Sequence, residues 1–423
     1  MNSVYAEALH YFVGTSLTTS DNIVKSADAE SGQEYSLDTG ISGLRKGSLI
    51  EAGGDAKLSY FSREKELFDN SEEVSANGVL FMNFSVLPTT FAWNNNVTAN
   101  TVLVDSRQAA NADNLSDQVS YNTEPEWRIK LSSVDSILLS ASYKYIEQEE
   151  LSDSKRLSGK VSWQHKMVAG QLSVNHVYED IDNDETVPGA TVSPGYRTEE
   201  FFLGYAKNLR SVDVDFNIGE ERISIDGVDS DNETLSLRAI INWTPWAGSR
   251  IRAKYSVGYE DNISQLNQLL SSNVQDLQAS ETAIGSALAL DTINAISKTK
   301  NSSVDYEQKV HVNNIKIQFA KIEQEHFRQI TSANNDEIAG RLSISRQLNP
   351  GMRFTFKEHY IEKLFEQGEI SRDYLTALQL HWRLSKRLIV DIDLVHENQS
   401  SDFPSAEFEA LSGVLSFRYT DIL

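Results

Sequence analysis

The sequence contains no cysteine in 423 residues, which excludes disulfides, thiolate metal sites and a cysteine nucleophile. It also lacks any apolar run near the roughly 18–20 residues that a membrane-spanning helix needs. Positive charge is scarce, because 38 Lys and Arg stand against 61 Asp and Glu and leave a net charge of −23. Nucleic-acid binding requires a basic surface. These absences exclude a helical membrane protein, and we expect no nucleic-acid partner.

Apolar and polar residues alternate along most of the chain. The run 212–218 reads Val-Asp-Val-Asp-Phe-Asn-Ile, and the runs 139–145, 251–259 and 388–394 alternate in the same way. Such a period of two is typical of strands with one apolar face and one polar face. A membrane β-barrel meets this pattern, because only every second strand residue must face lipid.

The connections between these runs alternate in length. Short ones lie near 45–48, 244–249 and 348–351, whereas polar connections near 178–194 and 260–302 are much longer. Short turns on one side and long loops on the other indicate an outer-membrane barrel. We predict an all-β fold, a single transmembrane antiparallel barrel of about 20 strands, within 18–22. An even strand number places both chain ends on the periplasmic side, and most of the excess acid falls in the long loops.

The first residues suggest how the chain begins. Val4 and Ala6 occupy the −3 and −1 positions of a small-residue cleavage site before Glu7. We therefore predict that residues 1–6 are the remnant of a signal peptide and that 7–423 form one barrel. The alternative is that these small residues occur there by chance.

One segment departs from the alternation. Between residues 262 and 298 the apolar residues take helical spacing, which predicts a helical insertion in one long loop. Connections of this length are uncommon unless they are functional or disordered. The segment is a candidate plug or gate of the pore, or a cap over it. Its apolar stripe consists of Ile263, Leu266, Leu270, Val274 and Leu277.

The sequence carries no catalytic signature. It has no Walker loop, dinucleotide fingerprint, HExxH or GxSxG motif, so we expect no enzyme activity, no catalytic residues and no cofactor. His359 and His381 lie on inward faces of strands that we predict to be neighbours. Single lumen imidazoles are more often pore lining than metal ligands, and we predict no metal site.

Charged residues on the inward strand faces are the candidate lumen lining. Asp391 and Asp393, like Asp213 and Asp215, share one strand face. Paired acids are used by glycosidases, but next to inward bases they more often form charge networks. The bases predict either an electropositive path for anionic solutes or acidic polysaccharide, or the mixed lining of any large polar lumen. They are Arg128, Lys130, Lys144, Lys160, Arg238, Arg252, Lys254, Lys316, Arg341, Arg353, Lys357, Arg383 and Arg418.

Several strand runs carry a family resemblance. They are 341–356 (RLSISRQLNPGMRFTF), 377–394 (ALQLHWRLSKRLIVDIDL), 411–419 (LSGVLSFRY), 76–80 (ANGVL) and 158–163 (SGKVSW). Together they resemble the outer-membrane barrel proteins associated with PEP-CTERM/exosortase systems, which occur with exopolysaccharide gene clusters. The resemblance implies a role in moving polysaccharide across the outer membrane and brings no catalytic residues with it.

Three functions follow as hypotheses. The leading one is a conduit for exopolysaccharide export, working with periplasmic export proteins in the outer membrane of a Gram-negative bacterium. The second is a general or anion-preferring diffusion porin. The third is a structural or surface-binding barrel whose acidic loops hold cations. All three imply contact with outer-membrane lipid and lipopolysaccharide, and none predicts the oligomeric state.

Overall fold

The computed structural model of the chain describes residues 5–6, 9–23, 25, 29–65, 71–87, 90–103, 115–148, 153–183, 195–226, 232–261, 296–326, 334–365, 368–402 and 407–422. These residues form strands, turns and bends, with no helix among them. No helix in this part of the chain is therefore long and apolar enough to cross a membrane.

Twenty-one strands follow one another along the chain. Their bounds are β1 Tyr5–Ala6, β2 His10–Ser20, β3 Gly32–Lys46, β4 Ile50–Lys65, β5 Ser71–Leu87, β6 Phe91–Leu103, β7 Leu115–Lys130, β8 Asp135–Gln148, β9 Ser154–Met167, β10 Gly170–Asn183, β11 Tyr196–Asn208, β12 Val212–Ile225, β13 Asn232–Trp243, β14 Ser249–Asp261, β15 Ile296–Val310, β16 Asn313–His326, β17 Asn334–Asn349, β18 Met352–Phe365, β19 Ile370–Arg383, β20 Leu388–Ser401 and β21 Phe408–Ile422.

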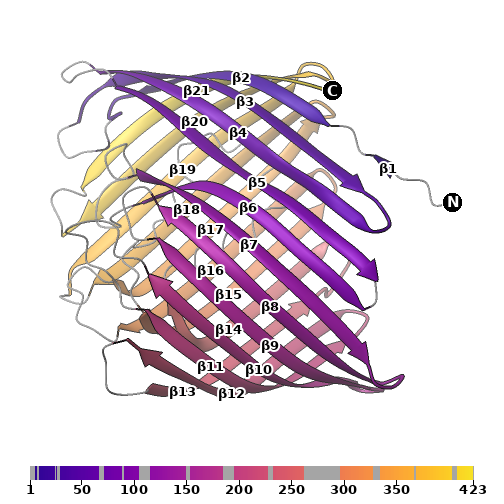
Figure 1. Cartoon of the computed structure of the whole chain (residues 1–423). Helices are drawn as coiled ribbons and strands as arrows, with labels where there is room; N and C mark the ends of the chain where they lie inside the picture. Colours follow the sequence, from indigo (N-terminus) through magenta and orange to yellow (C-terminus); the bar gives the residue numbers. More distant parts are fainter. Residues whose placement is uncertain are drawn as a thin grey trace.

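Strands β2–β21 form a closed antiparallel barrel (Figure 1). Each strand pairs with its neighbours in sequence, and β2 pairs with β21 from His10↔Ile422 to Ser20↔Ser412. Closure gives both outermost strands of the sequence a partner and so removes the edges of the sheet. The predicted all-β barrel of about 20 strands is confirmed. The short β1 continues the line of β2 and pairs with β3 at Tyr5↔Lys46.

The barrel has two unlike ends. Short turns such as 168–169 and 350–351 lie at one, the turn end, together with both chain termini (Figure 1). The longer connections lie at the other, the loop end. A further short connection at 88–90 joins β5 to β6, and sequence patterning did not resolve it. In the 244–248 turn, Gly248 has φ +81°, and a Cβ there would approach Lys309 O to 2.5 Å, so the turn requires glycine.

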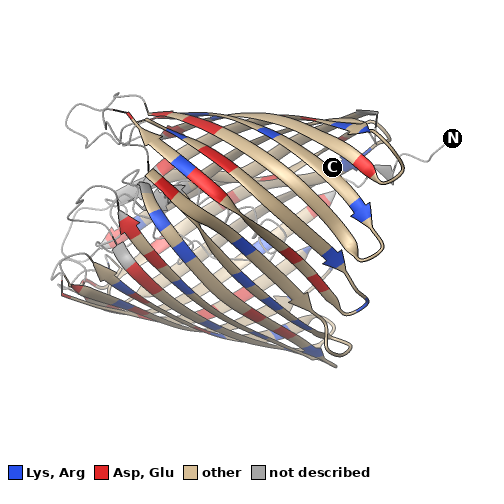
Figure 2. Cartoon of the chain, turned by 90° about the horizontal axis from the view of Figure 1, so that it is seen from below, with Lys and Arg blue, Asp and Glu red and all other residues tan. Residues whose placement is uncertain are grey.

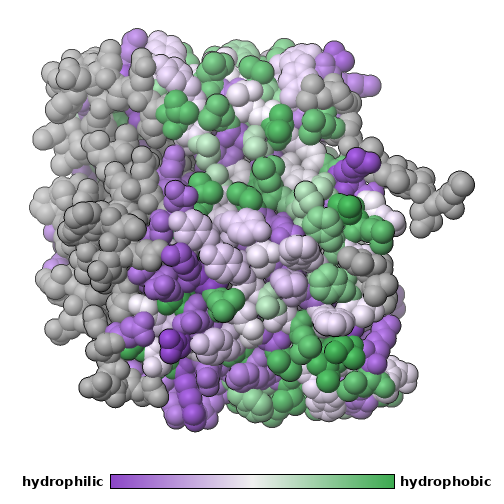
Figure 3. All heavy atoms as spheres, viewed as in Figure 1, coloured by the Kyte–Doolittle hydropathy of each residue, from purple (hydrophilic) through white to green (hydrophobic). Residues whose placement is uncertain are grey.

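The outer wall carries an apolar band. Leu37, Leu203 and Phe319 are exposed on this face, because strand alternation turns every second side chain outward. Hydrophobic residues spread over the wall and its turn end, and hydrophilic residues border the loop end (Figure 3). There, exposed ion pairs such as Arg197–Asp180 at 3.1 Å and Arg372–Glu362 at 2.8 Å ring the outer face. The wall is thus apolar where lipid chains would lie and charged at the loop end.

Two predictions about segments fall largely outside the described residues. Of the predicted signal remnant 1–6, only Tyr5 and Ala6 are described, in β1, so cleavage stays a prediction. The helical insertion was predicted for 262–298, and 262–295 lie outside the described residues. Its predicted end is wrong by three residues, because Ile296 already begins β15. All five residues of the candidate plug or gate lie outside the described residues, namely Ile263, Leu266, Leu270, Val274 and Leu277.

At two seams the strand pairing stops before the strands do. The β5–β6 register runs toward the loop end only as far as Gly78↔Ala99. The β13–β14 register stops at Leu237↔Val257. In both cases the described residues beyond these pairs stay paired with the neighbour on the other side. The wall therefore has two places near the loop end where adjacent strands separate.

Candidate functional site

The lumen wall consists of the residues that alternate with the outward apolar positions. Twenty strands at a spacing of about 4.8 Å and a tilt of about 40° give a barrel roughly 40 Å wide between opposite backbones. Side chains on the inner face are therefore the groups that any solute within the barrel would meet. Charged residues are scattered along the strands of the wall (Figure 2).

Every charged residue proposed from the sequence as lumen lining lies on the inner face. This placement follows from register, because each alternates with an exposed apolar neighbour on the same strand or faces another inward residue across a ladder. Their role as a solute path stays a prediction. The residues are Arg128, Lys130, Lys144, Lys160, Asp213, Asp215, Arg238, Arg252, Lys254, Lys316, Arg341, Arg353, Lys357, Arg383, Asp391, Asp393 and Arg418.

Bases gather on the inner face of β13–β18. Arg252 lies opposite Asp305, and Lys316 lies opposite Glu307, so two bases face acids across their ladders. The remaining inward bases of the proposed set on these strands face mainly polar residues, such as Asn217 opposite Arg238. Bases therefore exceed acids on this part of the wall, which we call the basic sector. Its members are Arg238, Arg252, Lys254, Lys316, Arg341, Arg353 and Lys357.

The two histidines proposed as lumen lining lie in different environments. Arg341 Nε donates to His359 Nε2 at 2.9 Å, whereas His381 Nδ1 lies 2.7 Å from Asp391 Oδ1. β18 and β19 are neighbours as predicted, yet in their register His381 faces Arg353 and is well separated from His359. The structure does not bring the two imidazoles together. In the described part of the chain, no three His, Asp or Glu side chains converge as ligands for a metal ion.

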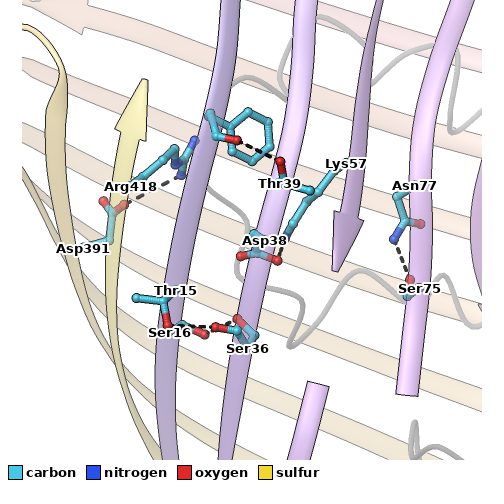
Figure 4. Close-up of polar contacts among 11 residues, drawn as sticks. Thr15, Ser16, Ser36, Asp38, Thr39, Lys57, Ser75, Asn77, Asp391 and Arg418 are labelled. Atoms are coloured by element: carbon cyan, nitrogen blue, oxygen red, sulfur yellow. Dashed lines mark hydrogen bonds and ion pairs between the residues drawn. The ribbon is translucent and has the colours of Figure 1, made fainter. Parts of the chain in front are cut away.

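A polar network crosses the strands where the barrel closes (Figure 4). Asp391, 4% exposed, lies 3.8 Å from Arg418 as well as next to His381. Farther along the wall Lys57 Nζ lies 3.0 Å from Asp38 Oδ1. Asp391 is thus held between a guanidinium and an imidazole, the arrangement of a charge network across strands.

The two acid pairs proposed from the sequence lie on separate strands. Asp213 and Asp215 lie near the turn end of β12, where Asn217 Nδ2 donates to Asp215 Oδ1 at 2.8 Å. Asp391 and Asp393 lie on β20, and both are 4% exposed. The pairs therefore stand apart along the wall, and each has polar partners of its own.

Uncharged hydroxyl and amide groups supply much of the remaining lining. Sequence reasoning selected charged residues only and missed this class, although the same alternation places it inward. Ser16 and Ser36 hydroxyls lie 2.7 Å apart, and Asn77 Nδ2 donates to Ser75 Oγ at 2.9 Å (Figure 4). Among the buried polar residues of the inner face are Ser36, Ser59, Ser75, Ser120, Ser162, Asn175, Ser236, Ser256 and Ser412.

Comparison with known proteins identifies likeness in fold. No family model matches the chain, and no characterised protein sequence matches it. Among solved structures it is similar to Acinetobacter baumannii OccAB4, with 9% identity, TM-score 0.41 and 100% of each chain covered. It is also similar to the FrpB iron transporter from Neisseria meningitidis, F5-1 variant, with 8% identity, TM-score 0.49, and coverage of 100% of this chain and 83% of that one.

A third similar structure is the outer membrane protein OpdK from Pseudomonas aeruginosa, with 10% identity, TM-score 0.41 and coverage of 99% and 100%. At these identities the likeness concerns the arrangement of strands. The chemistry of the site rests on the lumen wall itself: donors, acceptors and both signs of charge, with bases in excess on β13–β18. Such a wall can hydrate and guide a polar solute.

The loop end of the lumen differs from the rest. Ile181, Tyr196, Ile223 and Ile225 face inward on β10–β12 and form a buried cluster, against which Tyr259 of β14 packs. Glu221 Oε2 accepts a hydrogen bond from Tyr259 N at 2.9 Å. The loop-end part of β14 is thereby held against β12, across the seam that β13 leaves open.

Proposed function

We propose that this protein is an outer-membrane channel of a Gram-negative bacterium through which exported exopolysaccharide passes. The observation that carries the proposal is the hydroxyl- and amide-rich inner wall of a barrel roughly 40 Å wide. A hydrated polyhydroxylated chain can hydrogen-bond to such groups at little cost in free energy, because water can take the place of each hydrogen bond as the chain moves. Proteins of the periplasm would deliver the polymer, and lipopolysaccharide would surround the barrel.

The apolar band on the outer wall, bordered by charge at the loop end, supports a location in the membrane. A closed antiparallel barrel satisfies its backbone hydrogen bonds between strands, which is what hydrocarbon requires. The turn end, with both termini, would then face the periplasm. The acidic long loops would face outward, where they would hold cations or remain solvated.

The decisive experiment deletes the gene and measures polysaccharide outside the cell against polymer retained in the periplasm. Export predicts polymer retained inside and little outside, and the wild-type gene in trans restores secretion. Unchanged secretion after deletion contradicts the proposal. A point variant that fails to assemble is no substitute for this test, because an assembly defect also blocks secretion.

A second candidate, an anion-preferring diffusion porin, is favoured by the basic sector. In planar bilayers under a KCl gradient, the Arg252→Glu/Lys254→Glu variant should lower the chloride-to-potassium permeability ratio about twofold, since lumen charge concentrates counter-ions. The matched control is Ser302→Glu, which places a carboxylate on the outer face of the adjoining strand β15. An equal effect of the control would remove the argument for the basic sector.

A further inference from the structure

The turn end of the barrel is basic, although the chain as a whole is strongly acidic. At this end, the described turn residues and the three nearest residues of each strand in β2–β21 contain 13 Lys and Arg but four Asp and Glu. Bases recur at the strand tips on this side (Figure 2). We call these bases the turn rim. They are Arg45, Lys46, Arg128, Lys130, Lys166, Lys207, Arg210, Arg250, Lys309, Arg353, Arg383, Lys386 and Arg387.

Most of the turn rim faces the lumen. Ten of its bases lie on strands, and all of these except Arg45 and Lys207 share the inward phase of the alternation. Arg383, for example, follows Trp382, which is 41% exposed on the outer wall. Lipid headgroups meet the outer wall, so they cannot be the main partner of the inward bases.

The rim bases have fewer acidic partners than the bases at the loop end. There, Arg222 lies 2.9 Å from Glu233, and Lys321 contacts Glu323. On the turn rim, four bases contact an acid, and the other nine form no ion pair with any described residue. An acidic chain has ample carboxylates with which to pair them. The nine bases are therefore available to an anionic partner from outside the chain.

Arg353 and Arg383 show how the rim can hold an anionic group. Arg353 lies opposite His381 in the ladder, and Arg383 is two residues farther along the same strand as His381. Diagonal neighbours of this kind have Cα atoms about 7–8 Å apart, within the reach of long side chains. The acid on the adjoining strand, Asp391, is already in contact with His381 and Arg418. Two guanidinium groups so placed can bind one carboxylate or phosphate.

Uncharged donors and acceptors stand among the rim bases. Ser136 lies opposite Lys130, and Gln164 lies opposite Ser136 on the next strand. Gln347 lies opposite Arg353 in the same way. A partner that carries both anionic and hydroxyl groups can therefore bond to both kinds of side chain, whereas a purely acidic surface uses the bases alone.

We propose that the turn rim is the entry site of an anionic polysaccharide, whose carboxylate, phosphate or sulfate groups bind the lumen-facing bases. The inference rests on the proposed export function and adds the charge of the polymer and the place where it enters. The rim continues into the basic sector on β14–β18. The long connections at the other end carry most of the excess acid, so a polyanion is attracted at its entry and repelled at its exit.

Binding can be measured without any need for conduction. The protein is inserted into phosphatidylcholine nanodiscs, which contain no anionic lipid. Fluorescence anisotropy follows labelled oligogalacturonate, with a dextran oligomer of equal length as the uncharged comparison. The proposal predicts that oligogalacturonate binds about tenfold more tightly than dextran, and that added salt removes this difference by screening the charges.

Variants of the turn rim locate the binding site. Arg353→Gln/Arg383→Gln should raise the Kd for oligogalacturonate about fivefold, as expected for the loss of two exposed charge contacts. The control Arg197→Gln/Arg372→Gln removes the same charge from the outer face at the loop end and should leave this Kd unchanged. Lys130→Gln/Lys166→Gln serves the same purpose if the first variant does not fold. Folding is monitored by the resistance of the barrel to unfolding in SDS without heating.

Three outcomes would overturn the inference. Equal binding of the charged and uncharged oligomers would remove the anionic partner, and equal effects of the rim and control variants would remove the rim as its site. Tighter binding of an oligoglutamate of equal charge would identify an acidic protein as the partner instead. If gene deletion blocks secretion while binding shows no preference for charge, the export function stands and the anionic polymer alone is contradicted.

Discussion

At both the β5–β6 and the β13–β14 seams the ladder stops before its strands do, but the strand ends beyond the two points are held differently. At the β13–β14 seam, the Glu221 carboxylate bonds to Tyr259 N and a buried apolar cluster packs beneath it. At the β5–β6 seam the outer face instead carries a groove of about 360 Å³, bordered by Ile41, Leu58, Leu80 and Val97. One seam is bridged by side chains of the chain, and the other has a hollow in its outer face.

The difference shows how a barrel wall tolerates an interrupted ladder. Unpaired backbone groups are costly in hydrocarbon, so an opening needs a substitute partner or a position near water. Glu221 supplies that substitute from β12, the strand beyond β13. At the β5–β6 seam the opening begins at Gly78 and widens toward the loop end, where headgroups and water can reach the backbone.

The largest effect should come from truncating the packed cluster. Ile223 is 0% exposed, so Ile223→Ala should lower the free energy of unfolding by about 2–5 kcal/mol. Val97→Ala at the other seam should change it by roughly 0.5 kcal/mol, since this side chain is 38% exposed to the lipid face. Urea unfolding followed by tryptophan fluorescence measures both. Similar losses in the two variants would mean that the seams are held alike.

Removing the bridging carboxylate should have the next largest effect. Glu221→Ala leaves Tyr259 N without this acceptor, at a cost of about 1–3 kcal/mol. Hydrogen exchange should also speed up at the amides of 258–261. Glu220→Ala, a change on the outer face one residue away, is the control and should leave that exchange unaltered. Unchanged protection in Glu221→Ala would show that β14 is held by packing alone.

The coupling energies of ion pairs near the two seams should differ modestly. A double-mutant cycle on Lys57 and Asp38 should give a coupling of about 0.5–1 kcal/mol, because both side chains are mostly covered. Arg222 and Glu233, 2.9 Å apart on the outer face near β13, are more than half exposed and should couple by about 0.2–0.5 kcal/mol. A larger coupling energy for the outer pair than for Lys57 and Asp38 would contradict this prediction.

The smallest expected effect is a gain in the free energy of unfolding. Ala99→Leu fills part of the groove and should raise the free energy of unfolding by about 0.5–1 kcal/mol. Ala239→Leu adds the same bulk on the outer face of β13, within the paired part of the wall, and should be neutral within about 0.5 kcal/mol. Destabilisation by Ala99→Leu would indicate that the groove has no room for the added side chain.

Sequence patterning predicted the barrel well because its strongest physical constraint is local. Alternation fixes which face meets lipid, and it placed charged residues such as Arg252 and Asp391 correctly on the inner wall. The short 88–90 connection was missed because Pro88 and the following threonines do not separate two clear alternating runs. Neither seam could be predicted, because the point at which strand pairing stops depends on two strands together and is not encoded in the pattern of either one.

The groove could not be predicted from the sequence either. Gly78, Ala56 and Ala99 look like weak strand formers in sequence, and only their side-by-side register shows that they form one hollow. The Glu221–Tyr259 contact joins residues 38 positions apart and skips a strand. Hydroxyl lining could have been found, because the serines share the inward phase of the charged residues that were chosen.

The pairing of β2 with β21 also governs how the molecule is made. Its residue pairs are about 400 positions apart in sequence, as with His10 and Ile422, whereas neighbouring strands meet after one turn or loop. Closing so long a loop is entropically costly and slow, although the cost grows only logarithmically with length. The nascent sheet must therefore keep two unprotected edges until its last strand is available. In a circular permutant, with the two ends joined and the chain opened at a loop-end connection, another strand pair would close the barrel last. The finished wall would be unchanged.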